Sequence, residues 1–177
     1  IRSVDDVRDI LRCGADKVAI NTAAVKRPAL IAEVAQRFGS QCIVLGMDPV
    51  KTGDLKRFPS GYEVTVRGFR ERTGIDALEW AKKAESLGVG EIVVNSVDAD
   101  GTRKGFEIAL TRMMAESVRI PVVASGGAGD PAHLVEVFRD ALADAAIIAG
   151  MIHTGEYTIP SIKKALQAAG IPVRMTW

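Results

Sequence analysis

Two apolar segments near the end of the chain finish in glycine, a pattern typical of a phosphate-binding site. Residues 121–125 run into Gly126 and Gly127, and residues 145–149 end at Gly150 one helix later. The carboxyl ends of neighbouring parallel strands share one edge of a sheet, so backbone N–H groups from both turns can face one phosphate. A glycine-rich turn without a ligand is the alternative interpretation.

Carboxylates follow two other apolar segments. Asp48 ends residues 42–48, and Asp98 and Asp100 follow residues 91–96. Burial at the end of an apolar strand disfavours ionisation, so such an acid can exchange protons near neutral pH. We interpret Asp48 as catalytic. Asp98 and Asp100 have three open interpretations, which are catalysis, ligand binding and a turn.

Strand-like and helix-like segments alternate along the chain. This order predicts βαβ units, a parallel α/β sheet and one domain without an internal boundary. The five expected strands are residues 17–21, 42–48, 91–96, 121–125 and 145–149. The six expected helices are residues 4–13, 28–38, 76–87, 107–118, 131–141 and 159–169. Residues 50–74, with a strand-like 62–66, read as an insert forming a surface hairpin.

A phosphate site after the last two strands is characteristic of a (β/α)8 TIM barrel. The chain has 177 residues, no initiator Met and no strand before its first helix, whereas a closed barrel takes about 200–250 residues. We therefore expect residues 1–177 to form a single truncated barrel domain holding about strands 4 to 8. Its two open sheet edges predict self-association.

Composition limits the partners. With 47% hydrophobic residues and a net charge of +1, the chain has no basic excess for nucleic acid, and no apolar run is long enough for a membrane span. Two cysteines without CxxC spacing favour reduced thiols and a cytoplasmic location. Neither His133 nor His153 has a second ligand at metal spacing, so we expect no metal.

Five motifs together resemble the cyclase subunit of imidazole glycerol phosphate synthase, an enzyme of histidine biosynthesis. The resemblance covers essentially the full chain and implies a barrel from just after strand 3 to its end. The motifs are ADKVAINTAAV (15–25), FGSQCIV (38–44), DADGT (98–102), ASGGAG (124–129) and GIPVR (170–174).

The resemblance implies a lyase and cyclase that needs no cofactor. It uses ammonia, supplied by a glutaminase subunit, and a ribulosyl aminoimidazole carboxamide nucleotide with a phosphate at each end. The products are imidazole glycerol phosphate and an aminoimidazole carboxamide ribotide. Asp48 resembles the strand-5 catalytic acid, and Asp98 is our second catalytic candidate. The residues matching the two phosphate sites are Asn21 and Thr22 for one, and Asp100, Gly101, Gly126, Gly127, Ala149 and Gly150 for the other.

Lys17 and Glu91 begin their strands, at the opposite end from these acids. The resemblance implies a charged gate for ammonia there, and a rim salt bridge worth about 0–1 kcal/mol is the alternative. The family's second catalytic aspartate, on strand 1, has no counterpart, so we expect little or no activity from this chain alone. The phosphoribosyl-formimino isomerase of the same pathway and a non-catalytic phosphate-binding half-barrel remain alternatives.

Overall fold

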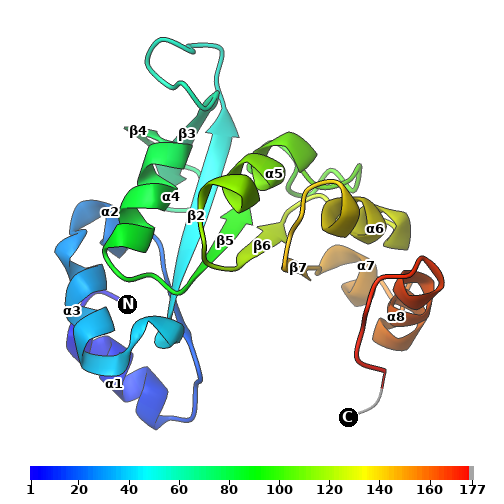
Figure 1. Cartoon of the computed structure of the whole chain (residues 1–177), viewed down its shortest axis with the longest axis horizontal. Helices are drawn as coiled ribbons and strands as arrows, with labels where there is room; N and C mark the ends of the chain where they lie inside the picture. Colours follow the sequence, from blue (N-terminus) through cyan, green and yellow to red (C-terminus); the bar gives the residue numbers. More distant parts are fainter. Residues whose placement is uncertain (176–177) are drawn as a thin grey trace.

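The computed structural model describes residues 1–175 and has an α/β fold with a mostly parallel sheet (Figure 1). The strands are β1 (Val18–Ile20), β2 (Ile43–Lys51), β3 (Tyr62–Val66), β4 (Glu71–Asp76), β5 (Glu91–Asn95), β6 (Val122–Ser125) and β7 (Ala145–Ile147). The helices are α1 (Val4–Arg12), α2 (Thr22–Lys26), α3 (Ala29–Phe38), the 3-10 turn η1 (Ser40–Cys42), α4 (Ala77–Ser86), α5 (Ile108–Ser117), α6 (Pro131–Arg139), α7 (Gly150–His153) and α8 (Ile159–Ala168).

The parallel strands lie side by side in the order in which they occur along the chain, β1-β2-β5-β6-β7. Strand β2 also pairs antiparallel with β3, which pairs with β4. The sheet is open, because no strand among residues 1–175 joins β7 to β1. In Figure 1 the blue N-terminal helices and the red helix α8 lie at opposite ends of the molecule.

Local sequence explains where the helices begin. Ser3 caps α1 in a capping box with Asp6, whose carboxylate accepts the Ser3 N–H. Asp130 caps α6, with Pro131 in the first turn. All five expected strands and six expected helices are present, with β7 ending two residues early.

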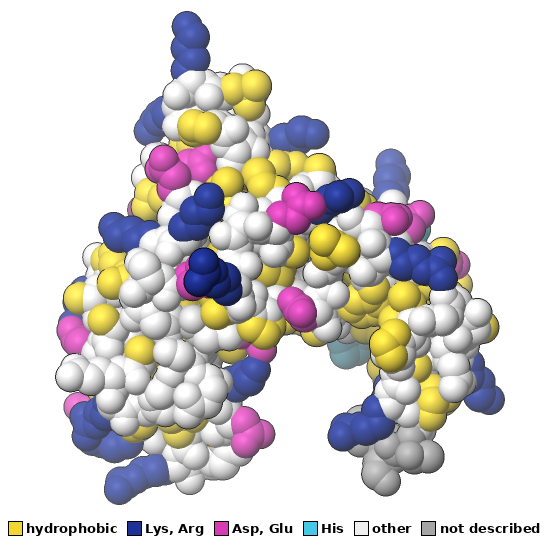
Figure 2. Space-filling model, viewed as in Figure 1, with side chains coloured by type: hydrophobic (Ala, Val, Ile, Leu, Met, Phe, Trp, Pro, Cys, Tyr) yellow, Lys and Arg dark blue, Asp and Glu magenta, His cyan; other side chains and the backbone are white. Residues whose placement is uncertain are grey.

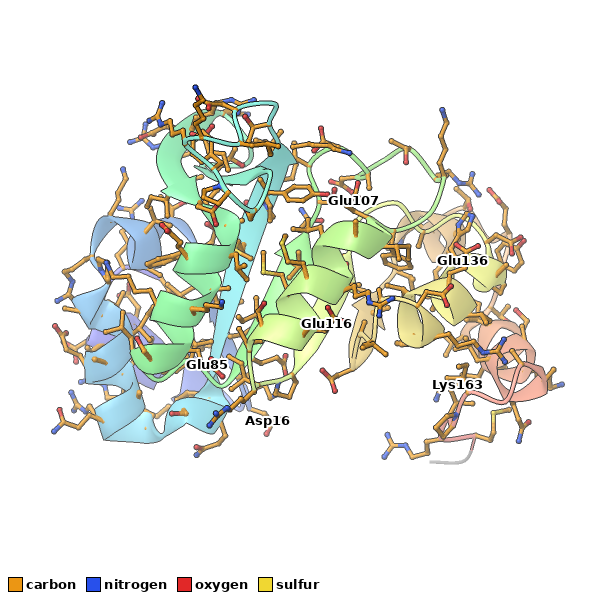
Figure 3. The ribbon with its side chains drawn as sticks, turned by 45° about the horizontal axis from the view of Figure 1, so that its top comes forward. Asp16, Glu85, Glu107, Glu116, Glu136 and Lys163 are labelled. Carbon is orange, nitrogen blue, oxygen red and sulfur yellow. The ribbon has the colours of Figure 1, made fainter. Side chains whose placement is uncertain are left out.

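The insert at residues 50–74 forms a hairpin, but the expectation that it lies on the surface is wrong for its first strand. Every residue of β3 is buried. Tyr62 and Val64 belong to the main core, beside Trp80 of α4. The Tyr62 hydroxyl donates to Glu107 Oε1 at 3.2 Å, and burial raises the pKa of Tyr62 to about 12. Glu107 is labelled in Figure 3 at the start of α5. The hairpin is therefore packed against the domain.

The two faces of the parallel sheet differ. Ile20, Leu45 and Ile92 are register partners, and all three are buried in the core that the helices cover. In Figure 3, α4 and α5 lie in front of this face. On the other face, Ala19 of β1 and Ile147 of β7 are exposed. We call this second face the uncovered face.

The surface is mixed in charge. Figure 2 shows Lys and Arg side chains spread around the periphery of this view, interspersed with Asp and Glu, and an arched outline below the sheet. Among residues 1–175, no helix combines the length and apolar character needed to cross a membrane.

Candidate functional site

The uncovered face carries a cluster of polar side chains where its strands end. Asn95 and Ser125 are register partners, and alternation from Val44 and Gly46 puts Asp48 on the same face. Asn21, which follows β1, continues the alternation from Ala19. Because the carboxyl ends of parallel strands meet at one edge, these polar side chains lie together.

Asp48 is at the centre of this cluster. Its Oδ2 accepts a hydrogen bond from Asn21 Nδ2 at 2.6 Å, and its Oδ1 accepts a longer one from Asn95 Nδ2 at 3.4 Å. Its backbone carbonyl accepts a bond from Thr65 Oγ1 at 2.7 Å, which ties β3 to the same position. The carboxylate is thus held between two amides from neighbouring strands.

Opposing effects set the proton affinity of Asp48. Burial raises the pKa of this carboxyl, the two amide hydrogen bonds lower it, and the charge of Asp100 raises it. The net shift of the Asp48 pKa is upward, so the environment favours the protonated form. The direction of this shift is the one expected for an acid at the end of an apolar strand, and the catalytic role of Asp48 stays a prediction.

A wide cavity of about 810 Å³ lies between β1, α2 and the tip of the β3–β4 hairpin. Asn21 and Thr22 line it, as the sequence predicts for one phosphate site. The Thr22 hydroxyl accepts a hydrogen bond from the Arg67 backbone N–H at 3.1 Å. Asn21 Oδ1 is buried and without a hydrogen-bond partner. The cations of the wide cavity are Arg2, Lys26, Arg27 and Arg67.

A compact cavity of about 130 Å³ lies between the loop after β5 and the ends of β6 and β7. The structure brings together in its wall all six residues predicted for the second phosphate site. They are Asp100, Gly101, Gly126, Gly127, Ala149 and Gly150. Its size suits one phosphate group rather than a whole nucleotide.

Two glycines determine the shape of the compact cavity. Gly127 has φ +101°, and a Cβ there would lie 2.0 Å from the carbonyl oxygen of Gly105. Gly126 has φ +89°, and a Cβ there would lie 3.0 Å from the carbonyl oxygen of Ser96. The Gly105 N–H also donates to the Gly127 carbonyl at 2.9 Å. The loop after β5 therefore packs directly on the glycine turn, which only glycine permits.

Asp98 and Asp100 follow the same strand but lie in different surroundings. Asp98 is exposed, and its Oδ2 accepts a hydrogen bond from the Lys51 backbone N–H at 2.7 Å. That contact joins the loop after β5 to the end of β2. Asp100 lines the compact cavity and acts on Asp48 through its charge. The turn interpretation applies to both residues, and Asp98 in catalysis stays a prediction.

Lys17 and Glu91 lie at the amino ends of β1 and β5, on the uncovered face. The Lys17 ammonium and the Glu91 carboxylate form an ion pair across the start of β2. The Lys17 side chain is 48% exposed and the Glu91 side chain 20%, so the contact adds about 0–1 kcal/mol to stability. The predicted pair exists, and its role as a gate stays a prediction.

Sequence reasoning missed several residues of the site, including Arg2, Lys26 and Arg27 in the lining of the wide cavity. Asn95 contacts Asp48, and strand alternation from Val93 could have identified it. Arg67 and Arg103 line the wide and the compact cavity respectively. Both adopt positive φ, +58° and +60°, which arginine rarely does, so no local pattern indicates them.

Comparisons with known proteins identify the family of the chain. The histidine biosynthesis protein family matches residues 1–158. The chain is 55% identical to imidazole glycerol phosphate synthase subunit HisF of Oleidesulfovibrio alaskensis and 56% identical to that of Syntrophobacter fumaroxidans. The corresponding protein of Desulfosudis oleivorans is 52% identical. Each match covers 100% of this chain and 68% of the relative.

Proposed function

The chain belongs to the histidine biosynthesis protein family, and from that premise we propose that it carries the cyclase chemistry of imidazole glycerol phosphate synthase. The substrates are ammonia and a ribulosyl aminoimidazole carboxamide nucleotide with a phosphate at each end. The products are imidazole glycerol phosphate and an aminoimidazole carboxamide ribotide.

The fold supports this proposal. Its parallel strands neighbour one another in chain order, and the helix-covered core lies on one face of the sheet. Consecutive βα units of a (β/α)8 barrel have this arrangement, with the uncovered face towards the barrel interior. We infer that the five parallel strands correspond to strands 4 to 8 of such a barrel.

The observation that carries the proposal is the pair of cavities at one edge of the sheet, with Asp48 connected to both. Asn21 lines the wide cavity and donates to Asp48. Asp100 lines the compact cavity and raises the pKa of Asp48. A substrate with a phosphate at each end would place its middle, where bonds change, near this carboxyl. Asn21 Oδ1, buried without a partner, can accept a hydrogen bond from the substrate.

Asp48 acts in this proposal as a general acid and base. Burial raises the pKa of Asp48, which favours its protonated form, while the two amides fix the direction of its oxygens. Asp98 is the second carboxylate candidate, and it would need to release the Lys51 N–H before it could reach the substrate.

The amino ends of the strands fit the entry of ammonia. Between the Lys17–Glu91 pair and Asp48, the uncovered face carries apolar residues and glycine, namely Ala19, Val44, Gly46 and Val93. Asn95 lies four positions after Glu91 along β5, about 13 Å of strand. We propose that a glutaminase subunit docks at this end and delivers ammonia past the ion pair. The open edges at β1 and β7 are the proposed sites of self-association.

Binding measurements test the proposal. We expect the chain to bind the bisphosphorylated nucleotide at least tenfold more tightly than a nucleotide carrying only one of its phosphates, because two linked contacts reinforce each other. Calorimetry with the two ligands gives this ratio. Equal affinities would contradict the proposal. Tight binding without ammonia-dependent turnover, in a chain completed with strands 1 to 3 of a relative, would favour a non-catalytic phosphate-binding protein.

A further inference from the structure

Arg103 lines the compact cavity and is the one cation among the residues that line it. It lies in the loop after β5, two residues after Gly101. Its φ of +60° is unusual for a residue with a side chain. A Cβ at Gly129 would lie 2.4 Å from the Arg103 carbonyl oxygen, so this loop lies directly on the chain that leads into α6.

The guanidinium of Arg103 is already paired. It forms an ion pair with Glu156, in the segment between α7 and α8, and both side chains are 43% exposed. The neighbouring Tyr157 donates to Asp130 Oδ2 at 2.9 Å, which anchors that segment to the N-terminus of α6. An exposed ion pair of this kind is worth little, so its guanidinium can change partners at small cost.

We propose that Arg103 is a phosphate ligand of the compact cavity, held by Glu156 when the cavity is empty and transferred to the phosphate when it fills. This inference rests on the proposed function, which puts a phosphate in that cavity, and it adds the positive charge that the glycine turns lack. A guanidinium binds phosphate through two parallel N–H donors, whereas backbone amides supply single ones.

The proposal gives the two partners of the ion pair opposite effects. Arg103→Gln removes the ligand, and Glu156→Gln removes its competitor. A purely structural salt bridge would respond to both substitutions in the same way. The matched control is the Arg112–Glu116 pair on α5, which has similar exposure and does not line the cavity.

The test uses the whole chain and inorganic phosphate at constant ionic strength, with affinity taken from the amide NMR shifts of Gly126, Gly127 and Gly150. We expect Arg103→Gln to weaken binding about tenfold, the effect of losing a charge-assisted hydrogen bond. We expect Glu156→Gln to strengthen it about two- to fivefold. Arg112→Gln and Glu116→Gln should leave it unchanged, and the thermal midpoint of each variant reports whether it folds.

The outcomes separate this inference from the proposed function. Phosphate binding by the unsubstituted chain with equal affinities in Arg103→Gln and Glu156→Gln overturns the role of Arg103 and leaves the phosphate site standing. Parallel weakening in both variants also overturns it, because that result indicates a structural bridge. If phosphate does not shift the amides of Gly126, Gly127 and Gly150 in the unsubstituted chain, the compact cavity is not a phosphate site. That result would contradict the proposed function as well as the role of Arg103.

Discussion

The wide and compact cavities lie at the same edge of the sheet but differ in what lines them. Side chains dominate the wide cavity, where four cations surround about 810 Å³. Glycine backbone dominates the compact cavity of about 130 Å³, where Arg103 is the one lining cation. In the wide cavity, several flexible side chains can share the contacts to one phosphate. In the compact cavity, no other residue type reproduces the backbone geometry of the glycines. Phosphate binding in the wide cavity should therefore tolerate a single substitution, and phosphate binding in the compact cavity should not.

Asp48→Asn tests whether phosphate binding and proton transfer depend on different groups. Of the substitutions considered, it should have the largest effect on the reaction rate. Loss of one general acid and base lowers a rate by about 10²- to 10⁴-fold. Because this chain alone is expected to have little or no activity, we expect ammonia-dependent turnover to fall by that factor in a chain completed with strands 1 to 3 of a relative, measured by product formation. Affinity for inorganic phosphate should stay the same in both cavities. Full turnover in this variant would show that another group transfers the proton.

Gly127→Ala tests the compact cavity directly. The added Cβ meets the Gly105 carbonyl, and alanine is strained at φ +101°. We expect about 1–3 kcal/mol of lost stability and at least tenfold weaker phosphate binding there. Denaturant unfolding and amide NMR measure the two effects. Gly150→Ala is the control for stability, because a Cβ at that position meets nothing within 4 Å.

Arg67→Gln tests the wide cavity and should have a smaller effect. The other three lining cations remain, so we expect only about two- to fivefold weaker phosphate binding. Raising the salt concentration should weaken this cavity more than the compact one, since exposed charges are screened. The shifts of the Asn21 and Thr22 amides give the affinity. Arg70→Gln is the control, from the same hairpin tip but outside the lining. If Arg67→Gln loses as much phosphate affinity as Gly127→Ala does, the proposed difference between the two cavities is wrong.

The pH dependence of stability gives the smallest expected effect. The folded chain raises the pKa of Asp48, so it holds that proton more tightly than the unfolded chain does. Stability therefore falls as pH rises from the ordinary carboxyl pKa through the raised one. We expect Asp48→Asn to raise the thermal midpoint by about 1–2 °C at pH 7 and not at pH 3, since the group is only partly buried. An equal change at both pH values would indicate a packing effect.

Local patterns determine much of this architecture, and long-range contacts determine the rest. The caps at Ser3 and Asp130 and the alternation of strands and helices follow from neighbouring residues, so they were predictable. The Asp98 contact joins residues 47 positions apart, and the Arg103–Glu156 pair joins residues 53 apart. No spacing rule indicates either contact. The burial of β3 was missed because its sequence does not reveal that α4 covers it.

The pairing of β2 has a consequence for local opening. This nine-residue strand is hydrogen-bonded to β1 and β5 and, from Asp48 onwards, to β3. Strand β7 has three residues and a single neighbour. Hydrogen exchange should therefore be slowest in the amides around Asp48 and much faster in β7. Strand β7, which forms one wall of the compact cavity, would open and close many times while the Asp48 carboxyl keeps its orientation. An anion could then enter the compact cavity without displacing Asp48.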